Sequence, residues 1–131
     1  MARPLSEDKR TAILEAATEV VAKLGVSAPT AKIAKGAGVA EGTLFTYFAN
    51  KDELLNQLYL ELKLELRDAM MPGYPAGEGQ IDRSRHVWDR YIRWGSAYPL
   101  NRRAMRQLAV SDRITEESKK LVGDAFGGST T

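Results

Sequence analysis

Few side chains in this sequence could carry catalysis or metal binding. The chain has no cysteine, which excludes thiolate nucleophiles, disulfides and thiolate metal sites. Its one histidine, His86, excludes a multi-histidine metal site. The sequence also lacks a nucleophile paired with a base and a glycine loop that could cradle phosphate. We therefore expect a protein that is not an enzyme and that has no catalytic residue, metal or cofactor.

The informative arrangement lies in residues 25–55 and would bind a partner rather than react with it. The pattern predicts two short helices, one from about residue 29 and one over about Glu41–Phe48, joined by a turn at Ala37-Gly38-Val39. The glycine permits the left-handed backbone of such a turn. A pair of this kind is a helix-turn-helix, whose second helix fits the major groove of DNA. An ordinary helical hairpin has the same spacing, so spacing alone leaves both interpretations open.

Longer helices must position this pair. Ser6 predicts the cap of a helix that ends at Gly25, and Asn50 predicts the cap of a helix that begins at Lys51. Leucines at every second position over residues 58–66 would by period alone indicate a strand, but helix-forming residues separate them and no β-branched residue occurs from 50 to 71. Wound as a helix, these leucines lie on two sides, which predicts a connector buried between two bodies.

A loop rich in proline and glycine, residues 71–79, marks the main boundary. Beyond it an apolar stripe at helical spacing predicts an amphipathic helix that packs on the core and ends at Pro99. Asn101 predicts the cap of a further helix, and Thr115 the cap of a last helix that ends at Gly127-Gly128. The stripe consists of Val87, Trp88, Tyr91, Ile92, Gly95 and Tyr98. No strand is expected, and the predicted fold class is all-α.

Charge is compatible with nucleic-acid binding but does not require it. The net charge is +2, from 19 basic and 17 acidic residues. Residues 1–51 hold seven basic side chains, Arg3 among them, and five acidic ones, whereas residues 52–71 hold two basic and five acidic ones. No apolar run could serve as a signal peptide or membrane span, so we expect a cytoplasmic protein without a membrane partner.

The segment from Thr30 to Leu55 resembles the signature of TetR-family repressors. In order, the matching residues are Thr30, Ile33-Ala34, Ala37-Gly38-Val39, Gly42-Thr43-Leu44, the aromatic Phe45, Tyr47-Phe48, Lys51-Asp52-Glu53 and Leu54-Leu55. The resemblance covers roughly the first half of the chain, and residues 88–121 resemble the family's regulatory domains weakly. It implies a helix-turn-helix head at 1–50, a connector helix at 51–71 and a partial helical regulatory, ligand-binding domain at 80–131.

The resemblance also implies a mode of action. A homodimer would place its recognition helices in successive major grooves of a near-palindromic operator in double-stranded DNA, about 35 Å apart. A small-molecule effector in the C-terminal helices would release the DNA, so the protein would be a repressor. Family members usually continue through further helices that build the dimer interface, and we expect this chain to be short at that end.

The resemblance assigns DNA-binding residues in the head. Thr30, Tyr47 and Lys51 match phosphate-contacting positions, although Thr30 could instead cap a helix and Tyr47 could instead serve in packing. Thr43 matches a groove-facing position, where it could meet a base edge or a thymine methyl group. The dipole at a helix start disfavours the cation of Lys51, which indicates an anionic partner. The full predicted set is Thr30, Lys32, Glu41, Gly42, Thr43, Phe45, Thr46, Tyr47 and Lys51.

Three departures from the family pattern concern the recognition helix. Ala40 stands where a capping serine is frequent, at a cost of about 1 kcal/mol in helix stability. Phe45 stands where tyrosine is common, so a hydroxyl contact is lost. Glu41 would face the groove and repel phosphate unless it accepts a hydrogen bond from a cytosine amino group. These departures bear on the operator sequence, not on DNA binding itself.

In the second half, Trp88, Tyr91 and Met105 are candidates for an effector pocket, and the same residues could simply belong to the core. Arg102, Arg103 and Arg106 form a basic cluster that could bind an anion or be a solvated face. Two other functions remain as alternatives. One is a helical enzyme, for which no site residues are found, and the other is a helical interaction module or fragment that no longer binds DNA.

Overall fold

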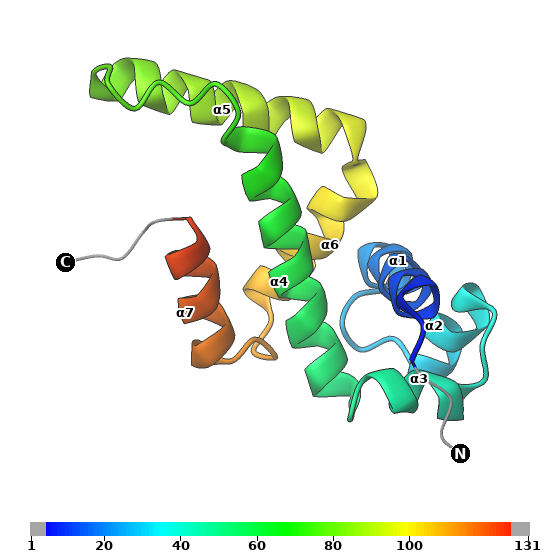
Figure 1. Ribbon diagram of the computed structural model, residues 1–131. Coiled ribbons are helices and arrows are strands. Elements are labelled where there is room, and N and C mark those ends of the chain that lie inside the picture. Colours follow the sequence, from blue (N-terminus) through cyan, green and yellow to red (C-terminus); the bar gives the residue numbers. More distant parts are fainter. Residues whose placement is uncertain (1–4, 127–131) are drawn as a thin grey trace.

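The computed structural model describes residues 5–126, which form seven helices and no strand (Figure 1). The predicted all-α class is confirmed. The helices are α1 (Glu7–Leu24), α2 (Thr30–Ala37), α3 (Glu41–Tyr47), α4 (Lys51–Met70), α5 (Gln80–Ala97), α6 (Pro99–Val110) and α7 (Glu116–Ala125). Arg3, the predicted stop at Gly127-Gly128, and the outer ends of the predicted segments 1–50 and 80–131 lie outside the described residues.

The predicted helix ends of the first half follow from local chemistry. The side chain of Ser6 accepts a hydrogen bond from the Lys9 N–H at 3.3 Å, and that of Asn50 accepts one from the Glu53 N–H at 2.8 Å. Gly25 ends α1 with a φ of 85°. A positive φ is strained for any residue with a Cβ, so glycine fixes where this helix stops.

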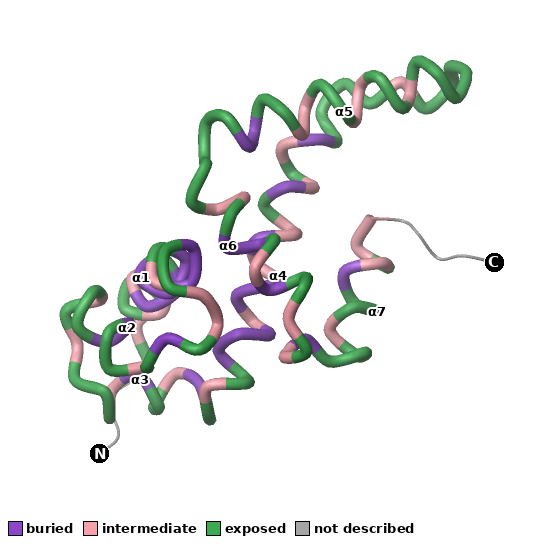
Figure 2. The backbone as a smooth tube through the Cα atoms, turned by 180° about the vertical axis from the view of Figure 1, so that it is seen from behind, coloured by how far each residue is buried: buried purple, intermediate pink, exposed green. Residues whose placement is uncertain are grey.

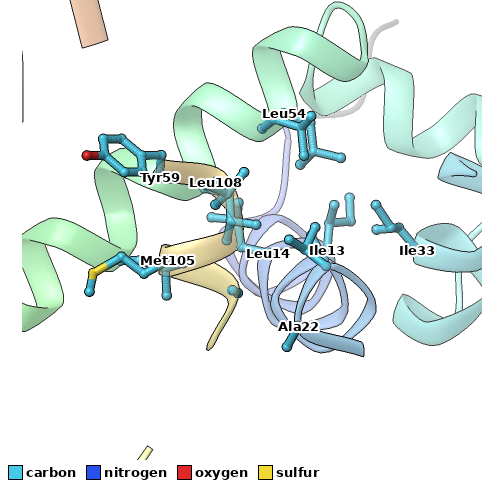
Figure 3. Packing of buried hydrophobic residues seen from close by; sticks show 14 of the residues in the cluster. Ile13, Leu14, Ala22, Ile33, Leu54, Tyr59, Met105 and Leu108 are labelled. Carbon is cyan, nitrogen blue, oxygen red and sulfur yellow. The ribbon is translucent and has the colours of Figure 1, made fainter. Parts of the chain in front are cut away.

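The connector helix α4 lies at the centre of the molecule and contacts α1, α5, α6 and α7 (Figure 1). Its leucines lie on two sides, as predicted: Leu55, Leu58, Leu62 and Leu66 are buried, while Leu60 and Leu64 are half-buried. α6 folds back to pack along α1, which brings Leu108 and Met105 close to Leu14 (Figure 3). The head, the connector and the C-terminal helices therefore share one hydrophobic core.

The predicted core stripe of the helix after the loop is wrong. On α5 the side chain of Trp88 is 66% exposed and that of Tyr98 is 52% exposed, whereas Trp94 and Gly95 are buried. The first part of α5 extends away from the rest of the molecule (Figure 2). The spacing correctly indicated a helix with an apolar side, but no helix among the described residues covers most of that side.

The predicted cap at Asn101 is also wrong. α6 begins two residues earlier, at Pro99, whose fixed φ and missing N–H suit the first helical position. Asn101 lies inside the helix, and its side-chain amide donates a hydrogen bond to the Glu65 carboxylate at 2.9 Å. None of the helices within residues 5–126 has the length and apolar character needed to cross a membrane.

Candidate nucleic-acid interface

The turn between α2 and α3 holds the second helix at a fixed angle to the first. Gly38 has a φ of 73°, in the left-handed region that glycine tolerates best. The Val39 N–H donates to the carbonyl oxygen of Ala34 at 3.0 Å, which closes the turn. Ile33 and Leu44 are fully buried beneath the pair. The helix-turn-helix is thus built from a glycine turn and a small apolar core.

The outer side of α3 presents the residues predicted for the DNA groove. Gly42, Phe45 and Thr46 are exposed, and Thr43 is half-buried. The Thr46 hydroxyl donates to the carbonyl oxygen of Gly42 at 3.1 Å, within the same helix. A Cβ added at Gly42 would meet no atom within 4 Å, so this position leaves open space at the start of the helix.

Two predicted site residues are joined to each other. The hydroxyl of Thr30 donates to the carboxylate of Glu41 at 2.5 Å, linking the starts of α2 and α3. The extended residue before α2 is Pro29, and Thr30 is already helical and makes no capping hydrogen bond, so its interpretation as a cap is wrong. Ala40 gives α3 no side-chain cap, as its residue type predicts.

Tyr47 links the end of α3 to the start of α1. Its hydroxyl oxygen accepts a hydrogen bond from the backbone N–H of Ser6 at 2.8 Å. The ring is half-buried, so the side chain has a packing role, while the hydroxyl proton is not used in this contact. The hydroxyl therefore keeps a donor for a phosphate oxygen.

Lys51 lies at the first position of α4 and is half-buried. Burial lowers the pKa of its ammonium group, the positive charge of Arg113 lowers it further, and the neighbouring Asp52 opposes these effects. Arg113 comes from the loop between α6 and α7, and its Nη1 lies 3.2 Å from Asp52 Oδ1. Sequence reasoning missed Arg113, because nothing in the local pattern places that loop beside α4. Lys32 lies apart from this group, exposed on α2.

The second predicted site is an open cavity of about 820 Å³ between α4, α5 and α7. Trp88 and Tyr91 line it, as predicted for an effector pocket. Met105 does not: it is buried on α6, in the core shown in Figure 3. The apolar wall also includes Leu66, Met70, Val87, Val122 and Phe126.

Two cationic side chains, Lys63 and Arg83, also line this cavity. Lys63 is half-buried, and burial lowers the pKa of its ammonium group. Its Nζ lies 5.6 Å from the centre of the Tyr59 ring, a cation–π arrangement. The remaining polar side chains are Tyr74, Gln80 and Ser84, and no carboxylate lines the cavity in the described part of the chain.

Comparison with known proteins supports the helix-turn-helix assignment. Residues 13–58 match the family described as bacterial regulatory proteins, tetR family. The chain belongs to the TetR family. The part of this TetR-family chain that matches includes α2, α3 and the first turns of α4, which carry every residue predicted for DNA contact.

Individual relatives of this TetR-family chain are regulators. An uncharacterized HTH-type transcriptional regulator, YhgD of Bacillus subtilis, is 38% identical over 79 residues, covering 56% of this chain and 41% of that protein. The Bacillus subtilis fatty acid metabolism regulator protein is 48% identical over 50 residues, covering 37% of this chain and 26% of that protein. The crystal structure of a TetR-family regulator from Shewanella sp. PV-4 superposes with a TM-score of 0.81 at 30% identity, covering 91% of this chain and 64% of that one.

Proposed function

We propose that this protein is a transcriptional regulator that binds operator sequences in double-stranded DNA and represses transcription as a homodimer. The observation that carries this proposal is the exposed outer side of α3, held by the Gly38 turn on a buried core. A helix in this position can enter the major groove, where Thr43 and Phe45 would meet base edges or thymine methyl groups.

The groups around α3 suit the DNA backbone. Phosphate contacts fix the position of a protein on DNA without reading its sequence. Lys51 and the hydroxyl of Tyr47 would supply such contacts on one side of α3, and Lys32 and Thr30 on the other. Because Thr30 donates to Glu41 in this structure, binding a phosphate there requires that hydrogen bond to open.

The test measures affinity for DNA from upstream of the protein's own gene at several salt concentrations, with sedimentation to count subunits. A dimer whose affinity falls steeply with salt supports the proposal. Lys51→Ala is expected to reduce the slope of log K against log [salt] by about 0.9, as loss of one phosphate contact does. Lys120→Ala, on the exposed surface of α7, removes the same charge and serves as the control.

Thr43→Ala tests the groove contact separately. It is expected to weaken binding to the upstream fragment while leaving the affinity for unrelated DNA unchanged, because a base contact contributes only at the matching sequence. The helical circular dichroism signal of both variants should equal that of the wild type. Salt-independent or absent binding by a monomer would favour the alternative of a helical interaction module.

We further propose that the cavity between α4, α5 and α7 holds the effector that releases the DNA. Its walls are mostly apolar, and Lys63 and Arg83 give it a positive charge. This lining fits a small, largely apolar molecule with an anionic group. α4 joins the cavity to the head, since Lys63 and Lys51 lie on the same helix.

Sodium decanoate is a suitable probe, with decyltrimethylammonium as the matched cation. In a Trp94→Phe variant, Trp88 is the one remaining tryptophan and reports on the cavity. Decanoate is expected to change its fluorescence and to weaken DNA binding, with both effects reduced by Lys63→Met. Equal responses to the two amphiphiles would show a detergent effect and contradict an anionic effector site.

A further inference from the structure

We propose that Arg113, in the loop between α6 and α7, is a further contact to a DNA phosphate, and that Asn56 positions it. The proposal rests on the DNA-binding function proposed above. It gives the C-terminal half of the molecule a direct part in the DNA interface, which the residues predicted from sequence confine to α2, α3 and the start of α4.

Asn56 fastens the loop to α4. Its side chain is 8% exposed, and its three hydrogen bonds all reach backbone atoms. Nδ2 donates to the carbonyl oxygens of Asp52 at 2.8 Å and Arg113 at 3.0 Å, and Oδ1 accepts from the Thr115 N–H at 2.9 Å. A buried amide with these partners holds the loop in one place, because moving it would leave buried polar groups unpaired.

The loop has further anchors of its own. Ile114 is buried in the common core. The hydroxyl of Ser111 donates to the carbonyl oxygen of Leu108 at 2.7 Å and accepts from the Arg113 N–H at 3.3 Å. The backbone of Arg113 is therefore fixed on both sides, although its side chain is 39% exposed.

This position puts a guanidinium group beside the start of α4. The loop lies toward the same end of the molecule as α3 and the first turn of α4 (Figure 1). Asp52, which follows Lys51 in sequence, holds Nη1 of Arg113 at 3.2 Å. Asp112 lies 3.8 Å from Nε but is 99% exposed, so solvent screens its charge.

The planar guanidinium has five N–H donors, so one ion pair with Asp52 leaves donors for a phosphate oxygen. The carboxylate of Asp52 would then orient Arg113 rather than only neutralise it. Lys51 and Arg113 together form a pair of cations that a single phosphodiester group could bridge. Arg113 contacts phosphate in this scheme, whereas Asn56 acts through it as a positioning residue.

The experiment is the salt dependence of binding by the full chain to the upstream DNA fragment. Arg113→Gln is expected to reduce the slope of log K against log [salt] by about 0.9, as Lys51→Ala does. Arg113→Lys should restore most of the slope, because it keeps the charge. Asn56→Ala keeps Arg113 but frees the loop, so it should also reduce the slope, and thermal unfolding will show whether the variant is folded.

Arg106→Gln, an exposed position on α6, is the control for net charge. Equal slopes for Arg113→Gln and the wild type, or equal losses for Arg113→Gln and Arg106→Gln, would overturn the proposal. If binding depends on Lys51 but not on Arg113, only this inference fails. If the wild type binds no DNA, the proposed function fails with it.

Discussion

The two helices that follow the proline- and glycine-rich loop have opposite surroundings. α6 buries Ala104, Met105 and Leu108 against the core shared with α1 and α4. α5 has an equally regular apolar stripe, but Trp88 and Ile81 on it are 66% and 74% exposed. An amphipathic pattern therefore indicates that a helix has an apolar side, and a packing partner decides whether that side is buried.

The difference also separates two roles within α5. Its last part packs on α4, where Trp94 is buried and its Nε1 donates to the Glu65 carboxylate at 3.3 Å. Its first part carries Trp88 and Tyr91 into the wall of the open cavity. Residues near the α5–α6 junction should thus control stability, while those farther back should control ligand binding.

The two tryptophans of α5 give the largest expected contrast. Trp94→Ala should lower the free energy of unfolding by about 3–5 kcal/mol, because it removes a buried aromatic ring. Trp88→Ala should lower it by less than about 0.5 kcal/mol, because the ring is mostly in solvent. Urea unfolding followed by circular dichroism measures both, and similar losses would mean that the two parts of α5 do not differ as described.

A second contrast compares the apolar sides of α6 and α5. Leu108 is fully buried, so Leu108→Ala should cost about 2–5 kcal/mol. Ile92 is 45% exposed, and Ile92→Ala should cost about 1 kcal/mol or less. The denaturant midpoint should shift while the m-value stays constant, since each change affects packing alone. A larger loss at Ile92 would place an unrecognised covering surface on α5.

The smallest expected effect concerns the start of α5, which no side chain caps. Gly79 precedes the helix in an extended conformation with a φ of −69°, and a Cβ there would meet no atom within 4 Å. Gly79→Asp should stabilise the helix start by a few tenths of a kcal/mol, about 0.3, because its carboxylate can accept a backbone N–H. Slower amide hydrogen exchange in the first turn of α5 would show it, whereas Gly77→Asp, two residues outside the helix, should have no such effect.

Local features of the head were predictable residue by residue. The caps at Ser6 and Asn50 and the glycine turn at Gly38 depend on backbone groups within a few positions, so the residue types suffice to place them. The same reasoning misplaced the start of α6, because Asn101 can cap a helix in general but Pro99 is better suited to begin this one. Near-neighbour chemistry fails where two local signals compete.

The contacts that join distant parts of the chain were decided by tertiary structure alone. Thr30 meets Glu41, Tyr47 meets Ser6, and Asn56 holds the backbone of Arg113, although 11, 41 and 57 residues separate these pairs. Such contacts depend on how whole helices pack, and helical spacing fixes only which side of each helix is apolar. The sequence by itself therefore determined the helices, their ends and the helix-turn-helix. Packing decided that α6 is covered, that much of α5 is not, and that a loop of the C-terminal half lies beside the start of α4.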